Sequence, residues 1–493
     1  MNNVVLYPAT AVGHLTPMME LARVFLELGY TVSVALIDDP LSTPVMNSAV
    51  ERAVASHPSV SFHWLRAAAT SLCFALAPAA DEHFLVRYLN LVRHNNEHFR
   101  DLLCSALVPQ PVHVVVIDTF LFHALDVRKE LGVPAYGFFP SGAGALAIYL
   151  QLPSLQAKCK ASFGELGDTP LDLLGVPPLP ASHVPVDMLL HPAESKICEA
   201  MMDMCKKIPE FDAIMVNTFE SLESRAAGAL GDSAGLLPGR ALPPVCCVGP
   251  LVKHGGVGGG EGAAKRHHHC LTWLDEQPDR SVVFLCFGSE GTHQQEQLRE
   301  IAVGLEKSGH RFLWVVQAPG STDPTKFLDR RADPDLAALL PEGFLERTSG
   351  RGVVVKLWAP QEDVLRHRAT GAFVTHCGWN SALEGVTAGV PMICWPLYAE
   401  QSMNKVLMVE EMGVAVEMIG WQQGLVAAEE VEAKVRLVME STAGGELRAR
   451  VRERMRAAAM AWAVDGGPSR AASARLLSYV RGQPTASLGN RGS

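Results

Sequence analysis

A chain of 493 residues, 48% hydrophobic and 19% charged, is long enough to bury large cores without disulfide or metal support. At ~100–200 residues per domain, this length predicts two to four domains. The 42 glycines and 32 prolines are too few for a disordered scaffold or a fibre. The formal net charge of −10, with no basic stripe apparent in the sequence, argues against nucleic acid and anionic lipid surfaces as partners.

Cysteine usage and the N-terminus point to the same compartment. The eleven cysteines are scattered without a CxxC pair, which indicates reduced thiols. The N-terminus lacks the basic segment and the cleavage site of a secretory signal. The uncharged stretch from Leu131 to Ala157 is interrupted by Pro134, Pro140 and Pro153, so a buried strand, a loop and a helix fit it better than a membrane span. We expect a cytoplasmic monomer without membrane insertion.

Short apolar runs alternate with helical patterns along the first half of the chain. The runs begin at Val4, Thr31, Val112 and Phe211, and helical patterns cover Met18–Leu28 and Leu121–Leu131. Near-continuous Val, Ile and Leu runs are typical of strands buried on both faces of a parallel sheet. Their alternation with helices predicts βαβ units.

The same alternation begins again in the second half. Apolar runs begin at Ser281, Phe312, Val353, Gly371 and Pro391, with a helix near Gln297–Ser308 and two later helices at Leu447–Val464 and Ser469–Val480. A glycine-rich stretch separates the two series and predicts a flexible linker, and Ala318–Ala332 reads as a surface insertion. We therefore predict domains at 1–252 and 270–465, a linker at 253–269, a C-terminal helix at 466–482 and a disordered tail at 483–493.

Two polar residues follow strands of the first series. His14 lies in the loop that we expect between the strand ending at Pro8 and the next helix, and Asp118 closes another strand. In parallel sheets, ligands bind beyond the carboxyl ends of strands. A histidine with an ordinary pKa of ~6.5 suits a general base, and a carboxylate can hold its tautomer. The alternatives are a histidine that caps local backbone and an aspartate that caps the next helix.

The segment GAFVTHCGWNSALEG reads as strand, tight turn and helix. His376 closes the strand, Gly378 permits the turn, and Asn380 or Ser381 opens the helix. The N-terminus of a helix attracts anions, so a diphosphate suits this position, held by amides, by Ser381 and by His376.

Other polar and aromatic residues extend this segment. Glu384 lies one helical turn further on and suits ribose hydroxyls, and Trp358 follows another strand and offers a flat face to a base. Glu400 and Gln401 end a third strand–loop unit, with polar groups that suit a sugar.

The stretch from Trp358 to Gln401 resembles the signature of plant family 1 glycosyltransferases, which use UDP-sugars. GHLTPMMELA at Gly13, VVIDTF, ELGVPAYGFFPSGA and SVVFLCFGSEG are similar to other family segments in the same order. The resemblance spans Val4 to about Val480. It implies an α/β fold of the GT-B type, with two Rossmann-like parallel-sheet domains that face a central cleft. The acceptor domain would be 1–252 and the UDP-sugar domain 270–465, with the helix at 466–482 returning to the acceptor domain.

The resemblance also implies roles for single positions. His14 would be the general base and Asp118 its orienting acid. The donor would be bound by Ser289, Trp358, Ala359, Gln361, His376, Gly378, Trp379, Asn380, Ser381, Glu384, Glu400 and Gln401. Among these, Trp358 would stack on uracil with Gln361 near the ribose, Glu384 would bind the ribose, and Trp379, Glu400 and Gln401 would contact the sugar. Gln401 favours UDP-glucose as the donor.

The remaining predictions concern the acceptor, through a group of aromatic residues, and the donor, through two departures from the family pattern. Phe120, Phe122 and Phe139 end strands on the side where the acceptor would lie, and Ser141 is predicted beside them. Glu400 stands where many relatives carry Asp. Pro140, which has no N–H to donate, stands where many carry Thr, so the strictness of donor choice stays open.

We therefore predict an inverting glycosyltransferase of plant secondary metabolism that moves glucose from UDP-glucose to a hydroxyl of a flavonoid- or chalcone-like phenol. The alternatives are C-glucosylation of a phenolic ring and a non-catalytic nucleotide-sugar-binding protein. We expect no metal or other cofactor. Asp333-Pro334-Asp335 and His267-His268-His269 are interpreted as solvated loop and linker residues.

Overall fold

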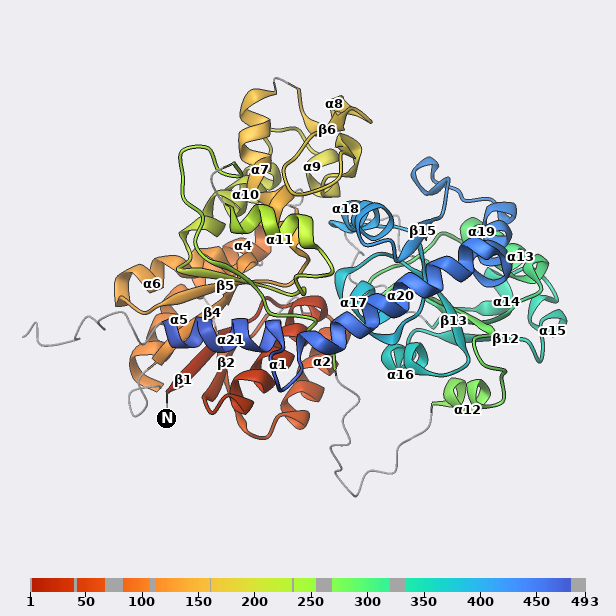
Figure 1. Ribbon diagram of the computed structural model, residues 1–493, viewed down its shortest axis with the longest axis horizontal. Helices are drawn as coiled ribbons and strands as arrows, with labels where there is room; N and C mark the ends of the chain where they lie inside the picture. Colours follow the sequence, from red (N-terminus) through yellow and green to blue (C-terminus); the bar gives the residue numbers. More distant parts are fainter. Residues whose placement is uncertain are drawn as a thin grey trace, which may run out of the picture. The chain divides into compact units, whose positions relative to one another are not determined.

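The computed structural model of the chain describes residues 2–39, 42–66, 83–106, 112–159, 161–232, 235–253, 268–319 and 333–479 (Figure 1). The chain divides into two compact units. Unit 1 contains Met1–Val176, Asp187–Leu251 and Met460–Ser493, and unit 2 contains Pro177–Val186 and Val252–Ala459. Most of the predicted linker, the insertion and the tail lie outside the described residues, so these predictions stay predictions.

Unit 1 is built on a parallel sheet of seven strands in the order β3-β2-β1-β4-β5-β8-β9. The strands are β1 Asn3–Tyr7, β2 Thr31–Ile37, β3 Val60–Leu65, β4 Val112–Asp118, β5 Ala135–Phe139, β8 Ala213–Val216 and β9 Val245–Cys247. The strand order reverses between β1 and β4, where β1 has β2 on one side and β4 on the other. Such reversals in doubly wound sheets create a crevice at the carboxyl ends of the strands.

Helices cover both faces of this sheet, which is why its strands are apolar throughout. Val4 and Leu6 of β1 point into one core with α1 and α2, while Val5 and Tyr7 point into another with α4, α5 and α6. The helical segments of unit 1 are α1 Val12–Glu27, α2 Pro44–Ser56, α4 Phe84–His94, α5 Asn96–Asp101, η1 Leu102–Ala106, η2 Thr119–Ala124, α6 Leu125–Leu131, α7 Ala143–Lys158, α8 Phe163–Leu166, α10 Lys196–Lys207, η4 Ile208–Glu210, α11 Ser224–Gly231 and α21 Pro468–Tyr479. The short strand β6 Pro170–Leu171 also lies here, and α9 Val186–Leu189 begins at the boundary between the units.

The last helix of the chain, α21, belongs to the core of unit 1 (blue in Figure 1). Leu476 and Leu477 are buried in the same core as β1. The hydroxyl of Tyr136 donates a hydrogen bond of 2.8 Å to the Leu476 carbonyl, and a ring nitrogen of His113 lies 2.8 Å from the Leu477 carbonyl. Residues from the two ends of the chain therefore share one hydrophobic core beside the sheet of unit 1.

Unit 2 repeats the plan with a parallel sheet of six strands in the order β12-β11-β10-β13-β14-β15. The strands are β10 Val282–Cys286, β11 Arg311–Val316, β12 Gly352–Lys356, β13 Thr370–Thr375, β14 Met392–Cys394 and β15 Ala415–Glu417. The order reverses between β10 and β13. The other elements are β7 Leu179–Pro180, η3 Ala181–His183, α12 His269–Asp275, α13 Gln295–Ser308, α14 Leu336–Leu339, α15 Phe344–Arg347, α16 Gln361–Arg366, α17 Trp379–Ala388, α18 Gln401–Val406, η6 Leu407–Glu411, η7 Trp421–Gln423, α19 Ala428–Glu440 and α20 Thr442–Ala461.

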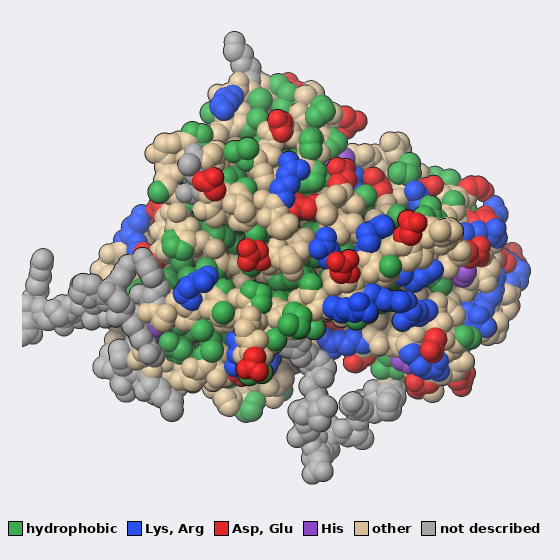
Figure 2. Space-filling model, in the orientation of Figure 1, with side chains coloured by type: hydrophobic (Ala, Val, Ile, Leu, Met, Phe, Trp, Pro, Cys, Tyr) green, Lys and Arg blue, Asp and Glu red, His purple; other side chains and the backbone are tan. Residues whose placement is uncertain are grey.

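Helix α20 carries arginine at every second position from 448 to 456. Figure 2 shows basic side chains in a row over the surface where Figure 1 draws this helix, so the chain does have a local basic row despite its negative net charge. Arg450 and Arg454 donate to the carbonyls of Gly413 and Met412, just past the end of η6. Part of the row therefore stabilises the C-terminal end of a helix.

Several predicted elements are confirmed, and their boundaries move. The stretch from Leu131 to Ala157 is a buried strand followed by a buried helix, as expected. Helix α1 begins at Val12 instead of Met18 and continues through Pro17, which lies inside the helix. His14 therefore lies in the first helical turn, and its prediction as a loop residue was wrong. Among the described residues, we find no helix with the length and apolar character that crossing a membrane requires.

We expect Leu477→Ala to destabilise unit 1. Leu477 is fully buried, and such truncations cost about 2–5 kcal/mol of unfolding free energy. Calorimetry and chemical denaturation measure the change, with Ala474→Ser at an exposed position of the same helix as the control. An unfolding midpoint equal to that of the wild type would contradict the docking of α21 described above.

Candidate active site

The strand reversal of unit 1 brings His14 and Asp118 together. His14 lies in the first turn of α1, which follows β1, and Asp118 ends the neighbouring strand β4. His14 Nδ1 lies 2.8 Å from Asp118 Oδ2. The Asp118 side chain is fully buried and the His14 side chain is 21% exposed. The sequence predicted both residues and left their contact open, and the structure makes that contact.

Asp118 fulfils both of the roles between which the sequence could not choose. Its Oδ2 contacts the imidazole, and its Oδ1 accepts a hydrogen bond of 3.0 Å from the backbone N–H of Phe120 at the start of η2. A carboxylate held at both oxygens cannot rotate freely, so the ring that it contacts is held in orientation too. Its position also favours a proton on Nδ1 of His14, which leaves Nε2 as the nitrogen able to take up a proton.

The predicted acceptor residues fall into two groups. Phe120 is partly exposed, and its ring meets that of His14 edge-on with 4.9 Å between centroids. Phe122, Phe139 and Ser141 are buried, with 3%, 2% and 7% of their surface exposed. Of the four, Phe120 is thus the residue in direct contact with the His14–Asp118 pair, and a role in acceptor binding stays a prediction for all of them.

The strand reversal of unit 2 places His376 between two glycines. His376 follows β13, and Gly288 follows the adjacent strand β10. A Cβ atom added at Gly288 or at Gly378 would lie 2.5 or 2.4 Å from His376 Nε2. Only residues without a side chain allow the ring to occupy this position. Ser289, the exposed neighbour of Gly288, belongs to the same loop, whose carbonyls accept from Gln317.

Burial determines the charge of His376. It lowers the pKa of the imidazole to about 4, so the ring is neutral at neutral pH. Within the described chain, its Nδ1 is buried without a hydrogen-bond partner. Buried polar atoms of this kind call for a ligand or water. A neutral His376 can donate a hydrogen bond to an anion but supplies no positive charge.

Helix α17 begins at Trp379, one residue before the predicted start, with Gly378 at its N-cap. A glycine cap contributes no side chain over the first turn, and no side-chain cap hydrogen bond is made there, which suits an anion at this position. Trp379 is buried with 4% of its surface exposed, whereas Asn380 in the same turn is partly exposed.

A glutamine ties α17 to the neighbouring helix α16. Gln361, the first residue of α16, donates from Nε2 to Ser381 Oγ at 2.9 Å and to Glu384 Oε2 at 2.6 Å. The sequence analysis placed Gln361 and Glu384 at the ribose and Ser381 at the diphosphate. The structure joins them in one hydrogen-bonded cluster.

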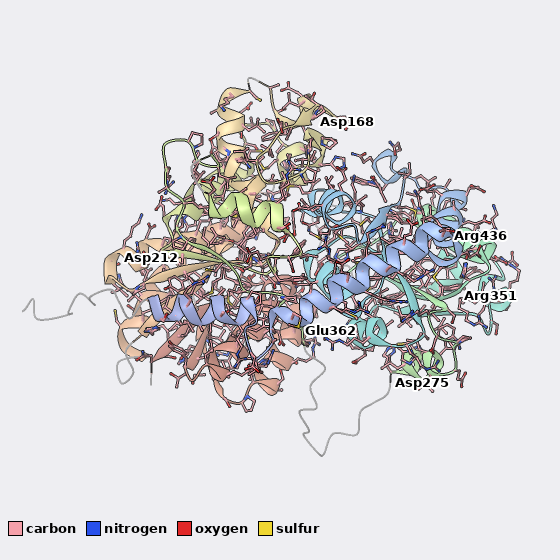
Figure 3. The ribbon with its side chains drawn as sticks, in the orientation of Figure 1. Asp168, Asp212, Asp275, Arg351, Glu362 and Arg436 are labelled. Atoms are coloured by element: carbon pink, nitrogen blue, oxygen red, sulfur yellow. The ribbon has the colours of Figure 1, made fainter. Side chains whose placement is uncertain are left out.

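Glu384 has an unusual protonation equilibrium. Burial, and to a lesser degree repulsion from Glu362, raises its pKa to about 7. Glu362 is labelled in Figure 3 and lies on α16 beside Gln361. A carboxylate with this pKa is only partly ionised near neutral pH and gains from any ligand that donates hydrogen bonds to it.

Trp358 and Ala359 form the loop that leads into α16. The Trp358 side chain is 59% exposed, which suits a stacking platform, while Ala359 is buried. The ring of His268 meets Trp358 edge-on with 5.9 Å between centroids, and its Nδ1 accepts from the backbone N–H of Cys270 at the start of α12. The prediction that His268 is merely solvated was therefore wrong, because it caps a helix and contacts an aromatic ring.

The third loop carries Glu400 and Gln401 at the start of α18. The side-chain Oε1 of Gln401 accepts from the backbone N–H groups of Leu397 and Tyr398 at 2.9 and 3.0 Å. Its Nε2 is then the group that can donate to a sugar. Asn404, which the sequence analysis missed, donates to the Cys377 carbonyl at 3.0 Å and to Glu400 Oε1 at 3.3 Å. The signal for it was its position four residues after Glu400, on the same face of a helix.

Backbone strain marks the same three loops. Among the residues that the structure describes, four that are not glycine have a positive φ, namely Arg280, Leu357, Cys377 and Ala399. The last three directly precede Trp358, Gly378 and Glu400. A left-handed residue with a side chain costs roughly 1 kcal/mol, and such strain tends to gather at functional sites.

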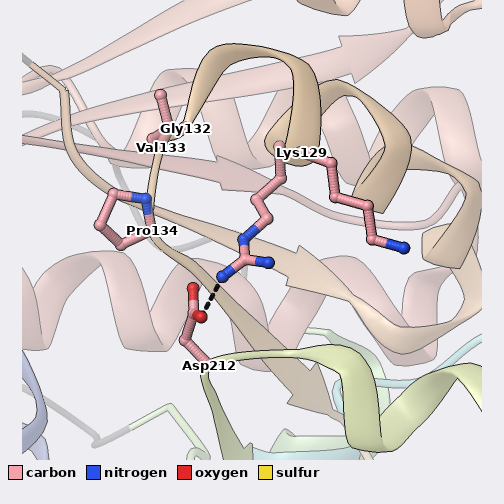
Figure 4. A pocket seen from close by; sticks show the side chains of 6 residues that line it. Lys129, Gly132, Val133, Pro134 and Asp212 are labelled. Atoms are coloured by element: carbon pink, nitrogen blue, oxygen red, sulfur yellow. Dashed lines mark hydrogen bonds and ion pairs between the residues drawn. The ribbon is translucent and has the colours of Figure 1, made fainter. Parts of the chain in front are cut away.

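A surface pocket lies at the amino ends of the strands in the sheet of unit 1, whereas His14 and Asp118 lie at the carboxyl ends. It has a volume of ≈ 260 Å³ and is lined by Arg128, Lys129, Gly132, Val133, Pro134 and Asp212 (Figure 4). Asp212 accepts from Arg128 and from the backbone N–H of Ala135, at the amino ends of β8 and β5. Arg128 and Asp212 neutralise each other, and Asp212 connects the amino ends of β8 and β5. We therefore assign this pocket no part in the candidate active site.

The aspartates of the Asp333-Pro334-Asp335 string have structural partners. Asp335 accepts from the backbone N–H groups of Ala337 and Ala338 as the N-cap of α14, and Asp333 pairs with Lys356 at 2.7 Å. Over the described ranges of the chain, no cluster of three or more His, Cys, Asp or Glu side chains has the arrangement of a metal site.

Comparison with known proteins finds similarity over nearly the whole chain. A model of the family described as UDP-glucoronosyl and UDP-glucosyl transferase matches residues 250–443. UDP-glycosyltransferase 88F4 of Malus domestica is 41% identical over 463 residues, covering 91% of this chain and 94% of that protein. The phloretin 2'-O-glucosyltransferase of Pyrus communis is 40% identical over 491 residues, covering 97% and 98%.

A solved structure agrees in fold. Phytolacca americana UGT2, complexed with UDP-2fluoro-glucose and pterostilbene, superposes with a TM-score of 0.80 at 32% identity, covering 97% of this chain and 99% of that one. The chain therefore belongs to the plant family 1 UDP-glycosyltransferases and has the GT-B type of α/β fold. It is a UDP-dependent glycosyltransferase, which confirms the family, the fold class and the enzyme class predicted from the sequence. The roles of single residues stay predictions.

We expect Gly378→Ala to weaken donor binding. The φ of Gly378 is −61°, which alanine adopts readily, so apart from a weaker N-cap of α17 the substitution acts through the contact with His376. Displacing the ring should cost about 1–3 kcal/mol of binding free energy, measured as a higher dissociation constant for UDP. Gly445→Ala is the control, because a Cβ there meets nothing within 4 Å. Equal affinities in both variants would contradict the crowding of His376.

We expect the affinity for UDP-glucose to rise with pH through the titration of Glu384. Ribose hydroxyls donate to the ionised carboxylate, so binding below the pKa of about 7 must first remove a proton. The affinity should increase by about tenfold from about pH 6 to pH 8, where the diphosphate diester does not titrate. Calorimetric titration measures it, and Glu384→Gln should bind with a flat profile. A flat wild-type profile would show that Glu384 does not receive the ribose.

Proposed function

We propose that the chain transfers glucose from UDP-glucose to a hydroxyl of a phenolic small molecule, with inversion at the anomeric carbon. The observation that carries this proposal is the hydrogen bond between His14 Nδ1 and the buried carboxylate of Asp118 at the strand reversal of unit 1. A histidine in such a pair is suited to take a proton from a hydroxyl group.

The residues of unit 2 support UDP-glucose as the donor. Trp358 offers an exposed ring for uracil, and the Gln361–Ser381–Glu384 cluster offers acceptors and donors for the ribose. His376 and the N-terminus of α17 suit the diphosphate, with Ser289 and Asn380 in the adjoining turns. Gln401 and Glu400 suit the hydroxyls of the sugar. The complex of Phytolacca americana UGT2 with UDP-2fluoro-glucose supports the same class of donor.

The acceptor class rests on the ring beside the base and on the relatives. Phe120 contacts His14 and offers an aromatic edge to a flat molecule. The Pyrus communis relative is named for phloretin, and the Phytolacca americana structure contains pterostilbene. We propose a flavonoid- or chalcone-like phenol as the acceptor.

The proposed reaction is a single displacement. His14 Nε2 takes the phenolic proton while the oxygen bonds to the anomeric carbon, and the bond from that carbon to the UDP oxygen breaks. The Asp118 carboxylate stabilises the imidazolium that forms, and the proton later passes to solvent. Hydrogen bonds from His376 and from the first turn of α17 stabilise the charge that develops on UDP. Attack opposite the leaving group converts an α-linked donor into a β-glucoside.

We expect His14→Ala to lower kcat for glucosylation of phenols by about 10²–10⁴-fold, because a general base contributes an effect of that size. The dissociation constant for UDP should stay unchanged, since the donor residues belong to the other unit. Mass spectrometry of a phenolic panel measures turnover. Unchanged transfer to every phenol would overturn the proposal, and UDP binding without turnover in the wild type would favour the non-catalytic alternative. Acid-stable products would indicate C-glucosylation.

Asp118→Asn is a matched variant. Its side-chain oxygen can still accept from the N–H of Phe120, while its amide faces His14 Nδ1 and favours the opposite tautomer. We expect kcat to fall sharply with the thermal midpoint nearly unchanged. If both stayed at wild-type values, Asp118 would be a helix cap alone.

A further inference from the structure

One short segment lies in a different unit from its neighbours in sequence. Pro177–Val186, here called the strap, belongs to unit 2, although the residues before and after it belong to unit 1. It contains β7 and η3, and His183 at the end of η3 is buried with 4% of its surface exposed. A surface connection would not need a buried histidine.

The strap contacts the loop that carries Glu400 and Gln401. The backbone N–H of Val186 donates to the carbonyl of Ala399 at 3.4 Å. Ala399 is one of the left-handed residues, with φ of 54°, and it directly precedes Glu400. A hydrogen bond to this carbonyl helps to hold a strained conformation that the backbone would otherwise leave.

The strap also contacts Trp421 in η7. The rings of His183 and Trp421 meet edge-on, with 5.6 Å between centroids and an angle of 87°. The indole Nε1 of Trp421 donates to Glu417 Oε1 at 2.8 Å. The same carboxylate oxygen lies 3.0 Å from Lys405 Nζ.

Lys405 connects this network to the start of α18. It lies four residues after Gln401 on the same helix, and its side chain is only 8% exposed. A buried ammonium group depends on its partner, because losing the carboxylate would leave an unpaired charge in the interior. Lys405 Nζ also lies 6.0 Å from the centre of the Trp421 ring. The helix that begins at Gln401 is therefore anchored through Glu417 to Trp421, and through Trp421 to the strap.

The rigidity of Gln401 within its loop makes this anchor important. Its Oε1 is bound to the N–H groups of Leu397 and Tyr398, so the side chain moves with the loop as one body. The position of its Nε2 is then determined by whatever holds the loop and α18. Asn404 holds one side through the Cys377 carbonyl, and the strap network holds another.

We propose that His183, Trp421, Glu417 and Lys405 are positioning residues that fix the start of α18, and with it the Gln401 amide, against the transferred sugar. This inference rests on the proposed function of Gln401 as a sugar contact. The network ends at the sugar loop, whereas Trp358 lies in another loop and Gln361 and Glu384 lie in α16 and α17. It should therefore control how the enzyme recognises the hexose and leave recognition of the nucleotide intact.

Two variants and one rescue variant test the network. Trp421→Phe keeps an aromatic ring beside His183 and removes the indole N–H that binds Glu417. His183→Ala removes the ring contact, and His183→Phe restores it. The measurements are KM for UDP-glucose, the inhibition constant of UDP, and the ratio of kcat/KM between UDP-glucose and UDP-galactose, which differ only at one sugar carbon.

We expect Trp421→Phe and His183→Ala to raise KM for UDP-glucose by roughly tenfold, the scale of effect that misplacing a contact produces. The inhibition constant of UDP should stay within about twofold, the preference for glucose over galactose should fall, and His183→Phe should recover most of the loss. The control is Trp462→Phe, which removes an equivalent indole hydrogen bond, to the Pro250 carbonyl in unit 1. It should change none of the three quantities.

Other outcomes would overturn the inference. If KM for UDP-glucose and the inhibition constant of UDP rose together, the network would stabilise unit 2 in general without positioning the sugar loop. Unchanged kinetics in both variants would show that the strap does not hold α18. Gln401→Ala distinguishes the proposed sugar contact from the network that positions it. If it leaves KM for UDP-glucose unchanged, the proposed sugar contact itself fails, whereas if it raises KM and the network variants do not, only the positioning inference fails.

Discussion

The reversal of strand order in each parallel sheet is the constraint on which the site depends. On either side of a reversal, the crossover helices leave toward opposite faces, so the loops beyond the strands diverge and leave room for side chains. In unit 1 the reversal between β1 and β4 places His14 beside Asp118, and in unit 2 the reversal between β10 and β13 places Gly288 beside His376. Residues about a hundred positions apart thus come into close contact, as a consequence of topology.

The loops of unit 2 combine strain with compensating hydrogen bonds. Cys377 and Ala399 hold left-handed backbones, and their carbonyls accept from Asn404 and Val186 respectively. Each bond fixes a conformation that presents the next residues of the loop. A loop that is already held in one conformation loses little entropy when a ligand binds, and this favours affinity even though the backbone is strained.

The sequence predicted the parts of the fold that follow from local pattern. Continuous Val, Ile and Leu runs predicted the buried parallel strands, and the position of His376 and Gly378 after such a run predicted the turn that leads into α17. What it missed depends on contacts between distant segments. Trp421 carries no special local pattern, and Asn404 is marked only by its spacing of four residues from Glu400. The glycine-rich context of His268 predicted a solvated residue, although His268 caps α12 and contacts Trp358. The neutral state of His376 also follows from burial, which the sequence does not reveal.

The two units are not the two halves of the sequence, and this affects how such enzymes can recombine. An exchange between relatives at the glycine-rich linker would transfer the C-terminal half as one block. His183 and Val186 would then contact residues that come from the other parent. Helix α21 would also come from the other parent, although it packs on the sheet of unit 1 and binds Tyr136. An exchange that keeps both units intact would replace the two blocks of unit 2 together, with crossovers near residues 177, 187 and 460 as well as at the linker. Each unit is therefore compact in space, but unit 1 is interrupted twice along the sequence.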